Sequence, residues 1–338
     1  MEPPATHGYR PPMTQQLCQF VWSVLALATM AGYPVFAAEA KKAAKASPTN
    51  TDDMWVARPL PASFPSNVTH HTYRSAVMQR DAGYCIYLPP SYAKDTQRRY
   101  PVIYNLHGAG GNETRTIYNA EVLHAGILAG QWPEIIMVFP NGGRATMYQD
   151  SADGRFPAET TFVRELMPHI DTTYRTIADR KGRCIEGFSM GGRGATHLAM
   201  RHPQLFCSLF NQAGNVYAAT VLAKTTSANV WPVNYLGTDP MHLSANDPFA
   251  NLTKNLAAIK ANLRIQVACG TADPDHLKTV REYHEALTRS GVEHTYWEVE
   301  GLDHNQRKMI DGRRSTWFDF HVESLRRAGA ELHFSQPH

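Results

Sequence analysis

The sequence predicts an α/β fold in which a mostly parallel central sheet carries helices on both faces. Short apolar runs of strand type alternate with stretches of helical spacing from about residue 68 onward. Several of these runs have a short apolar core, as strands covered on both faces do. Polar or glycine-rich loops follow the runs, at the end of a parallel sheet where binding sites form. We therefore expect the functional residues at the carboxyl ends of the strands.

The first four expected strands lie in the N-terminal half of this region. Val68–Arg74 and Tyr84–Leu88 are close enough in the chain to pair as a hairpin. Pro101–Leu106 is a short buried-type strand that ends at the loop His107–Gly111. Glu134–Phe139 is a second one, and it ends at a Pro-Asn-Gly-Gly loop over residues 140–143. Both glycine-containing loops are candidates for site-forming segments.

Two helices and a brief strand are expected in the middle of the chain. Apolar residues four apart predict a helix over Thr161–Tyr174, and Pro168 inside it predicts a kink. Arg183–Glu186 is a brief strand. The next helix begins soon after it and runs to about Arg201, where a His-Pro pair ends it.

The C-terminal part begins with an irregular stretch. Residues 215–247 have weak periodicity and many Asn, Thr and Pro residues, so we expect a lid or a pocket wall there. Helices are expected at 249–261, 277–290 and 305–327. Strands are expected at Arg264–Cys269 and Thr295–Val299, followed by loops at 270–273 and 301–304.

Composition excludes several classes of function. Of the 338 residues 43% are hydrophobic and 19% are charged, which is ordinary for a globular enzyme. The formal net charge is +3 and no dense basic block occurs, so nucleic acid is not an expected partner. No HExxH or comparable ligand spacing appears, so neither a metal nor another cofactor is expected. Of the five cysteines, all but Cys18 are expected to be buried thiols, although a disulfide of unassigned pairing is permitted by export.

The N-terminus indicates export. Phe20–Ala31 is an apolar run with the length of a signal-peptide core, too short for a comfortable membrane span, and small residues follow it. We expect a signal peptide over residues 1–38, a flexible lead-in over 39–60 and one catalytic domain over 61–330. The mature protein would be secreted or periplasmic, with no stable membrane insertion. The alternatives are an uncleaved N-terminal anchor and a start at Met13.

The pentapeptide Gly187–Gly191 indicates a catalytic serine. It fits the pattern G-x-S-x-G between a strand and a helix, where the serine sits at a strained turn with its hydroxyl exposed. The helix that follows points its positive end at developing negative charge. Ser189 is therefore the candidate nucleophile.

A serine hydroxyl needs a general base, and the base needs a carboxylate to orient it. In this fold type the order along the chain is Ser, then Asp or Glu, then His. Asp273 follows the strand Arg264–Cys269, and His304 follows the last strand, so both lie at strand carboxyl ends. Asp275 is the reserve candidate for the carboxylate.

The reaction also requires donors for the tetrahedral oxyanion. One is expected to be the backbone N–H of Met190, the residue after the nucleophile. The other is expected from the loop His107–Gly111, with Ala109 as first choice and Gly110 as second.

These residues together resemble the esterase D-like family of α/β hydrolases, over roughly residues 70–325. That family includes feruloyl and acetyl xylan esterases, S-formylglutathione hydrolase and mycolyltransferases. The resemblance implies an α/β-hydrolase fold and the same triad, and it suggests that Tyr148 and Asp150 border the acyl or alcohol pocket. Trp231 is a further candidate for a pocket that takes an aromatic acyl group. The matching stretches are residues 106–108, 148–151, 159, 165–171, 174–175, 187–192 and 269–273.

Three functions compete for this chain. The first is a serine carboxylic ester hydrolase with an acyl-enzyme intermediate, acting on a small-molecule or polysaccharide-linked ester, of feruloyl, acetyl or another aromatic or short-chain type. The second is an acyltransferase with the same triad, in which a hydroxyl group replaces water. The third is a non-catalytic binding module on a hydrolase fold. The sequence does not indicate the oligomeric state.

Overall fold

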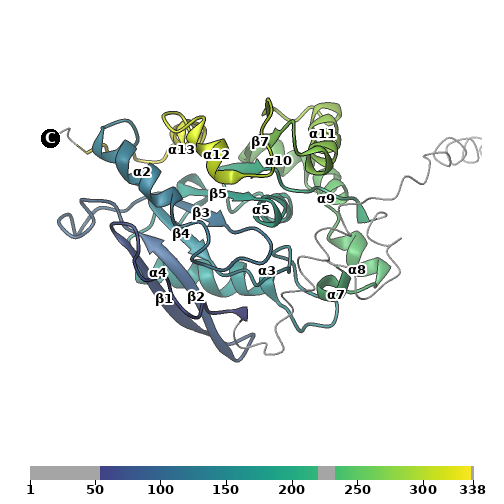
Figure 1. Ribbon diagram of the computed structural model, residues 1–338, viewed down its shortest axis with the longest axis horizontal. Helices are drawn as coiled ribbons and strands as arrows, with labels where there is room; N and C mark the ends of the chain where they lie inside the picture. The colour runs from purple at the N-terminus through teal and green to yellow at the C-terminus, as the bar shows by residue number, and fades with distance from the viewer. Residues whose placement is uncertain (1–53, 220–232, 336–338) are drawn as a thin grey trace, which may run out of the picture. The chain divides into compact units, whose positions relative to one another are not determined.

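The computed structural model describes residues 54–219 and 233–335 (Figure 1), all of which belong to one compact unit. Its centre is a sheet of eight strands in the order β1-β2-β4-β3-β5-β6-β7-β8. The strands are β1 Val68–Ser75, β2 Arg80–Tyr87, β3 Val102–Leu106, β4 Ile136–Pro140, β5 Arg183–Phe188, β6 Ser208–Gln212, β7 Arg264–Gly270 and β8 His294–Val299.

The pairing of these strands confirms the expected fold class. β1 and β2 form an antiparallel hairpin, and β2 is antiparallel to β4. From β4 to β8 every neighbouring pair is parallel. The loops after β3, β5, β7 and β8 therefore meet at one edge of the sheet.

Helices cover both faces of the sheet, and its central strands are buried. Every residue of β3, β4 and β6 is buried. Figure 1 shows α2, α12 and α13 along one side of the sheet and α3 and α4 along the other. α5 packs on β3, β5 and β6, whereas α11 packs on β7. The bounds are α2 Asn119–Leu128, α3 Ala158–Thr161, α4 Met167–Thr173, α5 Met190–Arg201, α11 Pro274–Arg289, α12 Gln306–Asp311 and α13 Asp319–Arg327.

Strand β6 does not appear among the expected strands. Three of its five side chains are polar, so the segment lacks the apolar run of a buried strand. Each polar group has a partner instead: Ser208 bonds to His321, Asn211 to Thr196 and Gln212 to Glu186. A polar segment can occupy the middle of a sheet when its hydrogen bonds are satisfied.

Several expected helices are interrupted. The helix expected over Thr161–Tyr174 contains a π-helical turn, η2 (Phe162–Leu166), directly before α4. The wide turn lies just before Pro168, which has no N–H to donate. The helix expected over 249–261 is divided at Asn255 into α9 (Pro248–Lys254) and α10 (Leu256–Asn262), and the one over 305–327 is divided into α12 and α13. The irregular stretch contains α7 (Val233–Leu236) and α8 (Pro240–Ala245).

The last part of the lead-in expected over residues 39–60 is packed against the domain in this structure. Residues 54–57 are buried, and the Ala57 N–H donates to the Glu113 carboxylate at 2.8 Å. The Trp55 carbonyl accepts from the Gly83 N–H at 2.7 Å. Residues 39–53 and the expected signal peptide lie outside the described residues. Within the described part of the chain, no helix is both long and apolar enough to span a membrane.

The four cysteines in the described residues are buried free thiols. The sequence predicts their burial and leaves a disulfide open. Cys184 and Cys207 lie closest, with 3.8 Å between their sulfur atoms.

Candidate active site

Ser189 occupies a strained turn between β5 and α5. Its backbone angles are φ 59° and ψ −122°, a region that costs a non-glycine residue about 1–3 kcal/mol. Two hydrogen bonds hold the turn. The Ser189 N–H donates to the Gln212 carbonyl at 2.9 Å, and the Ser189 carbonyl accepts from the Arg193 N–H at 3.0 Å. Strain kept at a single serine at the carboxyl end of a strand is typical of a nucleophile elbow.

The glycines on either side of Ser189 permit close packing of the turn. A Cβ atom on Gly187 would lie 2.4 Å from the backbone of Gly191. A Cβ atom on Gly191 would lie 2.1 Å from the Leu106 carbonyl oxygen, at the end of β3. Neither position has room for a larger residue, since these contacts are to backbone. The pattern G-x-S-x-G thus brings the turn against β3 and the loop after it.

The structure brings His304 and Asp273 together beside this turn. Nδ1 of His304 lies 2.5 Å from Oδ2 of Asp273. The His304 ring also packs against the ring of Phe188, the neighbour of Ser189, with 4.5 Å between ring centroids. Since Nδ1 donates to the carboxylate, Nε2 is the ring nitrogen that remains to accept a proton.

Asp273 is buried, and hydrogen bonds decide its charge. Burial alone would raise the pKa of the Asp273 carboxyl. Hydrogen bonds from His276 and His304 outweigh that effect and hold the pKa well below its usual range. The carboxylate is therefore ionised at neutral pH and available to stabilise a positive charge on His304.

Other histidines and carboxylates in the C-terminal part of the chain have different partners or positions. Asp303 is exposed and forms an ion pair with Lys308 at 3.1 Å. The buried His321 hydrogen-bonds to the Ser208 hydroxyl and donates to the Glu186 carboxylate, where α13 packs on the central strands β5 and β6. His294 begins β8, at the opposite end from the site. Asp275 is half-buried, and the carboxylate that contacts His304 belongs to Asp273.

The loop after β3 lies beside the nucleophile. A Cβ atom on Gly108 would be 4.0 Å from Ser189 Oγ. The Gly110 N–H donates to the Arg144 carbonyl at 2.7 Å, so it is not available to an oxyanion. Among the described residues, no acceptor bonds the N–H of Ala109 or of Met190, and Ala109 is exposed. This arrangement favours Ala109 over Gly110 as the donor from this loop.

His107 and Tyr148 hold that loop in place. The Tyr148 hydroxyl accepts from the His107 N–H at 3.0 Å. The His107 ring is buried: its Nδ1 donates to the Gly108 carbonyl at 2.9 Å, and its Nε2 accepts from the Gly142 N–H at 3.1 Å. Burial lowers the pKa of His107 to about 4, and the bond to Gly108 opposes this only in part. The neutral ring thus joins the loops after β3 and β4, a role that sequence reasoning missed because a histidine beside glycines gives no distinguishing pattern.

The structure places Tyr148 beneath the surface of the site, and its suggested pocket role stays a prediction. Its side chain is completely buried, and its ring lies where a Cβ atom on Gly142 or Gly194 would fall. Asp150 is half-buried, and its carboxylate accepts from the N–H and hydroxyl of Thr160 at 2.9 and 2.5 Å. Its contacts are those of a residue that orders the chain before α3. Trp231 lies outside the described residues.

A buried polar chain links the nucleophile turn to the loop of His304. The Glu186 carboxylate, three residues before Ser189, accepts from Gln212 at 3.0 Å and from Asn105 at 2.6 Å. Gln306, two residues after His304, donates to the Gln212 side chain at 2.7 Å. The two catalytic loops are therefore connected through β6, the strand that was not expected.

Asp273, His276 and His304 also form the cluster of potential metal ligands in the described residues. The two imidazole rings are stacked, with centroids 3.9 Å apart and planes 19° apart. The lone pair of an imidazole nitrogen lies in its ring plane, so the lone pairs of two stacked rings lie in nearly parallel planes and do not converge on one ion. Each Nδ1 instead bonds to its own oxygen of Asp273. The donor set fits a hydrogen-bonded carboxylate better than a tetrahedral metal site.

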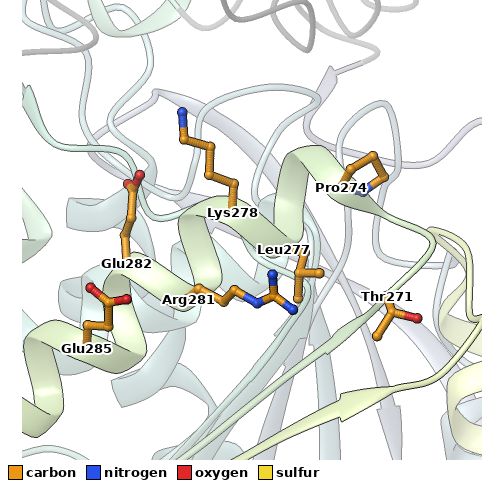
Figure 2. Close-up of a pocket in the computed structure, with 7 residues that line it drawn as sticks. All are labelled: Thr271, Pro274, Leu277, Lys278, Arg281, Glu282 and Glu285. Atoms are coloured by element: carbon orange, nitrogen blue, oxygen red, sulfur yellow. The ribbon is translucent and has the colours of Figure 1, made fainter. Parts of the chain in front are cut away.

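A shallow depression of about 540 Å³ lies on the outer face of α11. Figure 2 shows charged side chains from successive turns of that helix around it. Asp273 does not line it, so the depression is separate from the site of Ser189. Its lining residues are Thr271, Pro274, Leu277, Lys278, Arg281, Glu282 and Glu285.

Known proteins are similar to this chain over most of its described residues. The model of the Esterase family, described as "Putative esterase", matches residues 75–321. Esterase Rv1288 of Mycobacterium tuberculosis is 28% identical over 258 residues, which is 69% of this chain and 54% of that protein. The chain therefore spans about half the length of this curated relative.

Solved structures share the architecture. A ferulic acid esterase superimposes with a TM-score of 0.64 and 25% identity, over 79% of this chain and 100% of that chain. A ferulic acid esterase of Anaeromyces mucronatus, solved in complex with ferulic acid, gives a TM-score of 0.54 at 20% identity, over 79% of this chain and 93% of that chain. The α/β-hydrolase fold expected from the sequence is thus confirmed.

Proposed function

This chain belongs to the Esterase family, and from that premise we propose that it is a serine carboxylic ester hydrolase. Ser189 is the nucleophile, His304 the general base and acid, and Asp273 the residue that orients His304. The observation that carries the proposal is the 2.5 Å hydrogen bond between His304 and Asp273 beside the strained turn at Ser189. Strain and a buried ionised carboxylate are both costly, and a site retains them together when the chemistry requires them.

The first half of the reaction forms an acyl-enzyme. Ser189 Oγ attacks the ester carbonyl carbon while His304 Nε2 takes the hydroxyl proton. The carbonyl oxygen becomes an oxyanion, which accepts hydrogen bonds from the N–H groups of Ala109 and Met190. Each such donor is worth roughly 2.7–4 kcal/mol of barrier. When the tetrahedral intermediate collapses, the bond to the alcohol oxygen breaks, and protonated His304 gives its proton to that oxygen.

The second half returns the enzyme to its starting state. His304 takes a proton from water, and the hydroxide attacks the acyl carbon. The oxyanion occupies the same two donors, and the bond to Ser189 Oγ breaks. His304 then returns the proton to Oγ, and the carboxylic acid leaves. Ionised Asp273 stabilises the charged ring in both halves.

For the substrate we propose an ester of a hydroxycinnamic or short-chain acid. Two structurally similar proteins are ferulic acid esterases, and one of them was solved with ferulic acid bound. The alcohol would be a small molecule or a polysaccharide. No observation favours transfer to a second alcohol over hydrolysis.

The test is turnover of p-nitrophenyl acyl esters and methyl hydroxycinnamates by the parent chain and by Ser189→Ala. The parent should release product and the variant should not, although both should show the same thermal unfolding. A fluorophosphonate probe should label the parent alone. A folded parent that neither turns over nor labels would refute the proposal.

We also propose that the mature protein is secreted or periplasmic. The apolar run Phe20–Ala31 and the small residues after it support this proposal. N-terminal sequencing of the protein recovered from culture fluid or periplasm would locate the cleavage point, and an intact N-terminus retained in the cytoplasm would contradict export.

A further inference from the structure

Asp273 accepts hydrogen bonds from two histidines, one on each carboxylate oxygen. Nδ1 of His304 lies 2.5 Å from Oδ2, and Nδ1 of His276 lies 2.8 Å from Oδ1. His276 is 5% exposed and belongs to the first turn of α11. The triad proposed above thus has a fourth member in contact with its carboxylate.

The carboxylate is turned away from its ordinary local partner. Asp273 stands at the N-cap position of α11, where an aspartate usually accepts from a backbone N–H two or three residues on. No side-chain cap hydrogen bond forms at this helix. The side chain of His276, three residues after Asp273, takes one oxygen in its place and leaves the other for His304. His276 is therefore placed, by its position in α11 and by its hydrogen bond, to fix the orientation of the Asp273 carboxylate.

Two donors fix a carboxylate more completely than one. With His304 alone, the carboxylate of Asp273 could rotate about its last side-chain bond and still accept one hydrogen bond. A second donor fixed to α11 removes that rotation. The His304 ring is constrained as well, because it is stacked on His276 with 3.9 Å between centroids. The orientation of His304 is then determined by a rigid helix.

We propose that His276 is a positioning residue for the reaction: through its hydrogen bond to Asp273 it holds His304 in the orientation that proton transfer from Ser189 requires. This inference rests on the proposed esterase function. His276 touches neither the substrate nor the reacting atoms in this scheme, so its effect passes through Asp273. Loss of the hydrogen bond should lower kcat, with little effect on substrate binding.

Substitutions of His276 can separate the hydrogen bond from the stacked ring. In His276→Asn the amide nitrogen takes the place of Nδ1, so the donor is kept and the ring is lost. In His276→Phe the ring is kept and the donor is lost. We expect His276→Phe to lower kcat by roughly 10- to 100-fold with KM within about twofold of the parent. We expect His276→Asn to stay within about threefold of the parent.

The experiment measures kcat, KM and the rate of labelling of Ser189 by a fluorophosphonate in the full chain, with Glu282→Gln on the outer face of α11 as the control. If His276→Phe does not fold, His276→Gln replaces it, because its amide nitrogen takes the place of Nε2 and misses the carboxylate. Parent-like kcat in His276→Phe, or in the Gln variant that replaces it, would overturn the inference alone. Equal losses in the donor-keeping and donor-lacking variants would do the same. A parent without Ser189-dependent turnover would overturn the proposed function and this inference together.

Discussion

Acid should destabilise the fold through His107 before it protonates most carboxylates. Both ring nitrogens of this buried histidine are already used, one as a donor to Gly108 and the other as an acceptor from Gly142. A proton added at Nε2 would point one N–H at another. Burial accordingly lowers the pKa of His107 from 6.5 to about 4.

The sign and size of the effect follow from proton linkage. The unfolded chain protonates His107 near pH 6.5, whereas the folded chain resists protonation until about pH 4. The stability from the neutral ring is therefore complete above pH 6.5 and is lost as the pH falls toward 4. Each unit of pH between these values costs about 1.4 kcal/mol, so the loss reaches about 2.5 kcal/mol at pH 4.5.

Urea unfolding at pH 7.5 and pH 4.5, for the parent and for His107→Gln, measures this contribution. Glutamine can accept from the Gly142 N–H but does not titrate, and the other ionisable groups are common to both proteins. The parent should lose about 2.5 kcal/mol more than the variant between the two pH values. If the parent and the variant lose the same unfolding free energy to within about 0.5 kcal/mol, the argument is refuted, because His107 would then have the same pKa in the folded and unfolded chains.

Three further predictions concern packing and the buried polar groups. Gly191→Ala should destabilise the fold by about 2–3 kcal/mol, because its Cβ would fall 2.1 Å from a carbonyl oxygen. Thermal unfolding tests this, with Gly312→Ala as the control because a Cβ there would have no atom nearer than 3.4 Å, and equal melting temperatures for the two variants would contradict the steric argument. Glu159→Gln should cost about 2–3 kcal/mol in urea unfolding, since that carboxylate bonds two histidines and an arginine, and a cost below 0.5 kcal/mol would count against it. Gln306→Leu should lower kcat/KM roughly tenfold by releasing the loop of His304 from β6; steady-state kinetics with p-nitrophenyl esters tests this, and unchanged kinetics would show that the link has no catalytic role.

The sequence predicts the features that depend on local pattern. Apolar runs locate seven of the strands, and the order of Ser189, Asp273 and His304 along those runs is enough to bring the three loops to one edge of a parallel sheet. Local pattern does not reveal β6, whose polar side chains acquire partners only from distant segments.

Residues that act through tertiary contacts were missed for the same reason. His276 is one of sixteen histidines in the chain, and its position three residues after Asp273 does not reveal a hydrogen bond to that carboxylate until α11 brings the two side chains together. Tyr148 is a second example. Its resemblance to a pocket residue rests on a motif, whereas its burial rests on the loops that enclose it.

The buried segment 54–57 has a consequence for where the catalytic domain can be cut. The Met54 and Trp55 side chains approach Gly143, the neighbour of Arg144, and the Arg144 carbonyl holds Gly110 in the loop beside Ser189. A chain shortened to residue 75, where the family match begins, would lose this packing and expose the loop's support to water. The packed domain thus begins at an earlier residue than the family match does. A chain cut between these two points would keep every catalytic side chain but would lose the residues that pack beneath the loop His107–Gly111.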